Sequence, residues 1–87
     1  MERYVKLRAD LESVKAVDEM VILDDDSEQY FATNAAGTVL WEAMKDGSTV
    51  ENLTQQLVDA FEIDFDRAQA DTLGFVDQLD HLNMLEN

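Results

Sequence analysis

The sequence predicts an α+β fold in which a small antiparallel sheet is followed by three helices. Apolar and polar residues alternate through the first third of the chain, which is the period of strands. From Asn34 onward the apolar residues recur every three or four positions, which is the period of helices. At 87 residues without a proline, the chain fits a single domain of residues 1–87 with one small core.

The predicted strands fill the chain up to residue 33. Residues 4–8 alternate and predict a strand or an extended arm. Residues 11–17 alternate more weakly, and a turn of helix is the alternative to a strand there. Residues 20–23 predict a further strand, and the acidic turn 24–27 joins it as a hairpin to the strand Gln29–Thr33. We therefore expect a three-stranded antiparallel sheet ahead of the helices.

The first two helices carry recognisable start and stop signals. The first is expected to begin after Asn34, whose side chain can accept a hydrogen bond from the first turn, and to end near Gly47, because glycine adopts the left-handed conformation readily. The second starts at Ser48 or Thr49, and Ser48 with Glu51 fits the reciprocal capping pattern. Its apolar stripe is expected to consist of Val50, Leu53, Leu57, Val58 and Phe61.

The third helix is expected to be capped by Asp64 or Asp66 and to end at Asn83, after which Met84 and Leu85 fold back as an apolar contact. Its predicted inward side chains are Leu73, Phe75, Val76, Leu79 and Leu82. Core positions across the helices are expected to include Leu40, Leu53, Leu57, Val76 and Leu79, with the aromatic residues at positions 41, 61, 65 and 75. A winged helix-turn-helix fold in which the strands of the wing precede the three helices has this order of elements.

The charge of the chain excludes one large class of partners. The formal net charge is −14, and Lys45 and Arg67 are the only basic residues after position 15, against 17 acidic ones. Such a surface repels the phosphate backbone, so no nucleic-acid partner is expected. The acidity indicates a solvated surface or a basic peptide partner. Without cysteine or a long apolar run, we expect a soluble, cytoplasmic protein without a membrane partner.

No combination of residues predicts catalysis, a metal site or a cofactor. His81 is the only histidine, and at a helix end it is better explained by contact with backbone carbonyls than by acid–base chemistry. Asp24, Asp26 and Glu28 alternate, yet the glycine and the final glutamate of a calcium loop are missing. We interpret these three as a solvated hairpin turn.

Four stretches carry a resemblance to a known family. They are YFATNAAG at 30–37, LW at 40–41, DGSTVE at 46–51 and FVDQLDHLNML at 75–85. Together they resemble the PqqD-like family, the recognition domains of ribosomal peptide natural-product pathways, from about residue 5 to residue 85. Two positions depart from its pattern: Thr33 stands where leucine is usual, and Asn83 where glycine is usual.

The resemblance implies a non-catalytic module that holds the leader segment of a precursor peptide while maturation enzymes, such as a leader peptidase or a radical SAM enzyme, act on it. In this family the leader adds a strand to a sheet edge and packs against the third helix. The peptide-binding residues implied here are Gln29, Tyr30, Phe31, Ala32 and Thr33 on the strand, with Asp71, Phe75, Gln78 and Leu79 on the helix. The chain is most similar to the stand-alone subunits of lasso-peptide pathways.

Three alternatives are weighed against this hypothesis. A peptide chaperone of the PqqD type for a radical SAM enzyme would share the fold and the site. A winged-helix transcription factor is disfavoured, because the second and third helices offer only Arg67 as a basic residue. An oligomerisation domain stays open, because an exposed strand edge can also pair with a second copy of itself.

Overall fold

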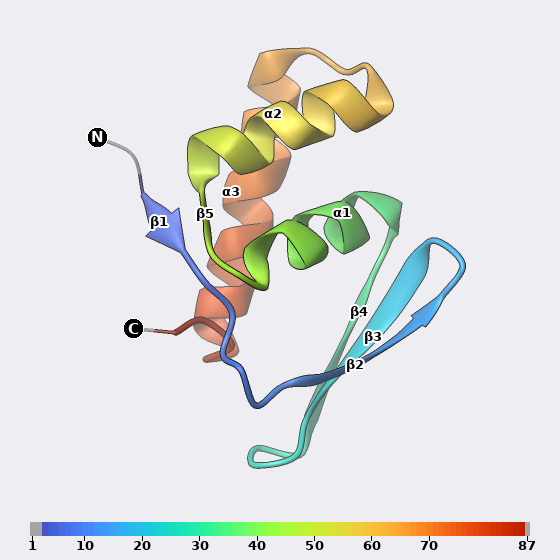
Figure 1. Cartoon of the computed structure of the whole chain (residues 1–87), viewed down its shortest axis with the longest axis vertical. Coiled ribbons are helices and arrows are strands. Elements are labelled where there is room, and N and C mark those ends of the chain that lie inside the picture. Colours follow the sequence, from blue (N-terminus) through green and yellow to red (C-terminus); the bar gives the residue numbers. More distant parts are fainter. Residues whose placement is uncertain (1–2, 87) are drawn as a thin grey trace.

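The computed structural model describes residues 3–86, in which three helices stand beside a three-stranded antiparallel sheet (Figure 1). This confirms the predicted α+β fold. The elements are β1 (Tyr4–Val5), β2 (Glu12–Ala16), β3 (Glu19–Asp24), β4 (Gln29–Thr33), α1 (Ala35–Met44), β5 (Ser48–Thr49), α2 (Val50–Phe61) and α3 (Phe65–His81). No helix of residues 3–86 has the length and apolar character needed to cross a membrane.

The sheet has the order β2-β3-β4, so the weakly alternating segment 11–17 does contain a strand. Ala16 pairs with Glu19 across a two-residue turn, and Asp24 pairs with Gln29 across a four-residue turn. Along β3 every second residue is buried, beginning with Met20. The sheet therefore turns one face to the helices and the other to solvent, as period-two alternation requires.

The N-terminal arm lies outside this sheet. Tyr4–Val5 pairs antiparallel with Ser48–Thr49, and Leu7 forms an isolated bridge with Leu85. Asn83 has φ 57, the left-handed conformation expected at the end of α3, and it turns the chain so that the C-terminal segment reaches the arm. The arm and the C-terminal segment thus close over the core together.

The helix caps follow the sequence signals with one correction. The side chains of Asn34 and Asp64 each accept a hydrogen bond from the backbone N–H three residues on, which confirms both as N-caps. Gly47 has φ 93, as expected after α1. The N-cap of α2 is Thr49 rather than Ser48, because the Thr49 hydroxyl accepts the capping hydrogen bond while Ser48 is buried in β5.

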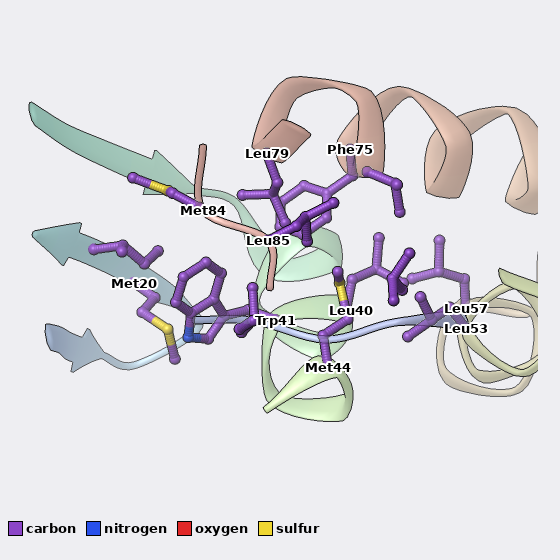
Figure 2. Packing of buried hydrophobic residues seen from close by; sticks show 14 of the residues in the cluster. Met20, Leu40, Trp41, Met44, Leu53, Leu57, Phe75, Leu79, Met84 and Leu85 are labelled. Atoms are coloured by element: carbon purple, nitrogen blue, oxygen red, sulfur yellow. The ribbon is translucent and has the colours of Figure 1, made fainter. Parts of the chain in front are cut away.

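The buried apolar side chains form one cluster between sheet and helices (Figure 2). All five core leucine and valine positions named from the sequence are at most 2% exposed. The members of the cluster are Val5, Leu7, Met20, Ile22, Leu40, Trp41, Met44, Leu53, Leu57, Ala68, Phe75, Val76, Leu79, Met84 and Leu85.

Three predicted core positions were wrong: Leu73 is 46% exposed, Phe61 39% and Phe65 43%. A strict spacing of three residues turns by about 60° at each step around a helix with 3.6 residues per turn. The positions assigned inward on α3 therefore drift around the helix, and the most N-terminal of them, Leu73, faces solvent. Phe61 ends α2 and Phe65 begins α3, so both flank the connection between these helices. Phe61 lies beside a hollow that it shares with Lys15 and Asp18.

Candidate functional site

The candidate site begins at the outer edge of β4. β4 pairs with β3 on one side, and no strand within residues 3–86 pairs with its other side. The edge residues are Gln29, Tyr30, Phe31, Ala32 and Thr33. Such an edge offers unpaired backbone N–H and C=O groups to an incoming strand.

The turn lengths establish which N–H groups of β4 point outward. A two-residue hairpin turn closes on a hydrogen-bonded pair, here Ala16–Glu19, and hydrogen-bonded pairs alternate along an antiparallel ladder. Glu19 therefore directs its N–H to β2, and its neighbour Met20 directs its own to β4. Continued through the register, this places the N–H of Phe31 toward β3 and those of Tyr30 and Ala32 toward the free edge.

A groove of about 640 Å³ runs beside this edge, between β4, the start of α1 and one face of α3. Its lining mixes apolar side chains with hydroxyl, amide and charged groups. The lining residues are Phe31, Ala32, Thr33, Asn34, Ala36, Gly37, Leu40, Arg67, Ala70, Asp71, Gly74, Phe75 and Gln78.

The strand–helix corner at one end of the groove is closely packed. A Cβ added to Gly37 would lie 2.9 Å from Cβ of Thr33 and 3.1 Å from Cε1 of Phe75, so only glycine allows α1 to approach this closely. The Thr33 hydroxyl lies 2.8 Å from the Thr38 hydroxyl, which donates to the Asp18 carbonyl. This pairing satisfies the buried threonine that stands where the family pattern has leucine.

Aromatic contact joins the strand to the helix across the groove. The ring centroids of Phe31 and Phe75 are 5.8 Å apart and the rings are tilted by 48°, a favourable arrangement for aromatic pairs. Phe75 is 9% exposed and Phe31 is half-buried. The pair therefore fixes the distance between β4 and α3 while leaving part of Phe31 open to the groove.

Most of the predicted peptide-binding residues meet at this groove. Phe31, Ala32, Thr33, Asp71, Phe75 and Gln78 line it. Tyr30 lines an adjoining hollow of about 360 Å³ that shares Phe31 and Gln78 with the groove and extends to His81. Gln29 begins the same edge. Leu79 is 0% exposed, so the structure places it in the core beneath the wall and not on the groove surface.

Sequence reasoning missed several lining residues, above all Arg67, Ala70 and Gly74. Helical spacing was the available signal for Arg67 and Gly74, which lie four and three residues from Asp71, because residues three or four apart share a helix face. Ala70 lies four residues from Gly74. At the rim, Nε of Arg67 lies 3.9 Å from Oδ2 of Asp71. Both side chains are well exposed, so this ion pair holds neither charge firmly and leaves both open to a partner.

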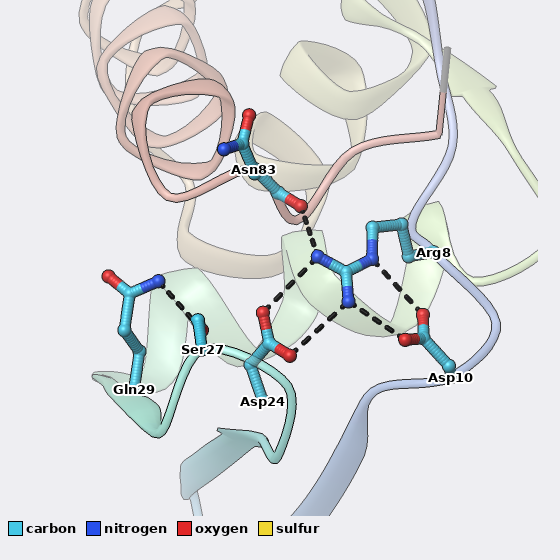
Figure 3. Close-up of polar contacts among 6 residues, drawn as sticks. All are labelled: Arg8, Asp10, Asp24, Ser27, Gln29 and Asn83. Atoms are coloured by element: carbon cyan, nitrogen blue, oxygen red, sulfur yellow. Dashed lines mark hydrogen bonds and ion pairs between the residues drawn. The ribbon is translucent and has the colours of Figure 1, made fainter.

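A second polar cluster lies away from the groove and fastens the arm (Figure 3). The Arg8 guanidinium contacts Asp10 at 2.8 Å and Asp24 at 3.2 Å, and it donates to the Asn83 carbonyl. Oxygens of Asp10, Asp24 and Asp26 lie within 4.8 Å of one another, yet two of these carboxylates bind Arg8. The cluster thus links the N-terminal arm, the hairpin turn and the end of α3.

The same contacts shift the ionisation of these carboxyl groups. The hydrogen bond from Arg8 lowers the pKa of Asp10 below its ordinary value. Burial raises the pKa of Asp24, but hydrogen bonds from Arg8 and Ser27 outweigh it and leave that pKa lowered. Both carboxylates are therefore charged at neutral pH, as the ion pairs require.

Comparisons with known proteins show structures of the same fold and a matching family. The structure of TbiB1 in complex with the TbiA(beta) leader peptide is similar at a TM-score of 0.84, with 23% identity over 94% of this chain and 95% of that one. A lasso peptide synthetase B1 complexed with the leader peptide is similar at a TM-score of 0.80, with 23% identity over 95% and 98%. No curated protein matches the chain. Residues 19–85 match the family described as coenzyme PQQ synthesis protein D, so the chain belongs to the PqqD family.

Proposed function

We propose that this chain binds the leader segment of a ribosomally made precursor peptide, which adds as a fourth strand to β4 and places side chains in the groove. The observation that carries the proposal is the free β4 edge running beside a groove of about 640 Å³ whose lining includes Phe31, Leu40 and Phe75. Strand addition takes its affinity from backbone hydrogen bonds and its specificity from side-chain pockets, and this site supplies both. The two similar solved structures, each in complex with a leader peptide, support a leader peptide as the ligand.

We propose further that the protein is not an enzyme and acts in the cytoplasm. The groove is lined by backbone, apolar, hydroxyl and amide groups and the Arg67–Asp71 pair, without a histidine or cysteine to act as nucleophile or base. A partner must therefore carry out the chemistry on the bound precursor. We propose a leader peptidase as that partner. A radical SAM enzyme, as for a chaperone of the PqqD type, is the alternative.

The acidic surface supports the choice of ligand. With a net charge of −14 the domain attracts lysine and arginine residues of an approaching peptide at long range. Such steering weakens as salt screens the charges, over a Debye length of about 8 Å at physiological ionic strength. Association with a basic leader should therefore slow as salt rises, while dissociation changes little.

Amide hydrogen exchange by NMR tests the site directly. The probe is a synthetic peptide of the leader segment from the precursor encoded beside this gene, added in excess. Because the amides of Tyr30 and Ala32 point to the free edge, they should exchange quickly in the free protein and become protected in the complex. Ser13, whose amide points outward from the opposite edge by the same alternation, is the matched control. Protection at Ser13 and not at Tyr30 and Ala32 would contradict the proposed site.

Self-association is the second candidate, because β2 also leaves its outer edge unpaired within the described residues. All five residues of Glu12–Ala16 are exposed, so nothing else covers this strand. Light scattering over a concentration series, with and without the leader peptide, separates the two functions. A dimer that persists at low micromolar concentration and does not bind the peptide would favour self-pairing.

A further inference from the structure

The glycine in the middle of α3 has no structural explanation. Gly37 is required by the contact with Thr33, and Gly47 by its left-handed φ. Gly74 lies within the 17-residue helix Phe65–His81, its φ is not positive, and a Cβ built on it would meet nothing within 4 Å. The fold alone would therefore accept alanine at this position.

Glycine inside a helix is unfavourable. It is the poorest helix former after proline, because the unfolded chain loses more conformational freedom there than at any other residue. Neither backbone conformation nor steric crowding offsets this loss at Gly74. The residue therefore weakens α3 without benefit to the free protein.

The position of Gly74 indicates what the missing side chain leaves room for. Gly74 is exposed and lines the groove, next in the chain to Phe75 and one helical turn from Ala70 and Gln78. The small residues Ala70 and Gly74 leave space between α3 and β4. Phe31, Leu40 and Phe75 add apolar side chains to the lining of this space. A side chain at position 74 would occupy the space through which a peptide on β4 reaches that apolar lining.

We propose that Gly74 is a specificity-determining position, which keeps open a subsite for one large apolar side chain of the bound leader. This inference rests on the proposed function and specifies its ligand. Leader side chains on the α3 side of the added strand recur every second residue. The one that comes to lie opposite Gly74 packs against the helix backbone with Phe31 and Phe75 beside it, which selects an aliphatic or aromatic residue there.

A larger residue at position 74 should raise the stability of the free protein and lower its affinity for the leader peptide. Gly74→Ala should raise the melting temperature by about 4–8 °C, since the helix gains a residue of higher propensity. The same variant should bind the synthetic leader peptide at least about tenfold more weakly, because the added methyl overpacks the subsite. Gly74→Leu should bind more weakly still. Gln69→Ala, at an exposed position of α3 outside the groove, is the control and should retain wild-type affinity.

A compensation experiment separates a steric subsite from a general disturbance of α3. An alanine scan of the leader peptide against wild type identifies the apolar position that binds most strongly. A leader peptide with alanine substituted at that position should bind Gly74→Ala and wild type with nearly equal affinity. Full affinity of Gly74→Ala for the unaltered leader, a uniform loss with every leader, or a lowered melting temperature would each overturn the inference. Failure of wild type to bind any leader would overturn the proposed function and this inference with it.

Discussion

The substitution Leu57→Ala tests the packing that holds the groove in place. Leu57 is 0% exposed at the centre of the apolar face of α2. Removing three buried carbon groups loses roughly 2.4 kcal/mol of transfer free energy at about 0.8 kcal/mol each. The cavity left behind adds to this, for a total loss of about 2–5 kcal/mol in the free energy of unfolding. For a domain of this size, that lowers the melting temperature by at least about 8 °C.

The matched control is Leu73→Ala on α3. Both changes remove the same atoms from a helix, but Leu73 is 46% exposed, so its loss should stay within about 0.5 kcal/mol. Urea denaturation followed by far-UV circular dichroism measures both free energies under one set of conditions. Equal losses for the two variants, or a loss below 0.5 kcal/mol at Leu57, would refute the assignment of α2 and α3 faces.

Three further changes follow from particular contacts. Gly37→Ala should lose about 1–3 kcal/mol, because the new Cβ meets Thr33 at 2.9 Å; thermal denaturation measures it, and a gain in stability would contradict the close packing. Because the pKa of Asp24 is lowered on folding, its contribution is present above its ordinary value of 3.8 and is lost as the pH falls through the lower folded value. Denaturation of Asp24→Asn should accordingly show a shallower dependence on pH in this acid range than wild type, and an unchanged slope would argue against the Arg8 ion pair. Asn83→Ala should be about 1 kcal/mol less stable than Asn83→Gly, because φ 57 favours glycine, and equal melting temperatures would exclude strain there.

Periodicity and capping chemistry were enough to predict the sheet strands and the helix starts, whereas the free edge at β4 was implied by the resemblance to the PqqD-like family. The switch from period two to period 3.6 at Asn34 is local information, and so are the caps at Asn34 and Asp64. The buried face of α3 does not follow from the pattern alone, because a run of apolar residues at spacing three is consistent with more than one rotation of the helix. Leu73 was placed inward for that reason.

The direction of each backbone N–H on β4 could not be read from the sequence. It depends on the length of the turn between β2 and β3, and that turn consists of Val17 and Asp18, with Val17 at φ 57. Valine rarely adopts this conformation, so no turn signal marks the position. The groove is also a tertiary feature: Arg67 and Gly74 become part of it only when α3 packs beside β4.

A proline scan across the β4 edge tests the central claim, that the leader pairs with this strand, most directly. Proline removes a backbone N–H, and only Tyr30 and Ala32 direct theirs outward. Calorimetry against the synthetic leader peptide should show affinity reduced about tenfold or more for Tyr30→Pro and Ala32→Pro, with folding intact. Phe31→Pro should instead destabilise the fold, while Ser13→Pro on the opposite edge should bind like wild type. Unchanged affinity in well-folded Tyr30→Pro and Ala32→Pro would contradict strand addition at β4.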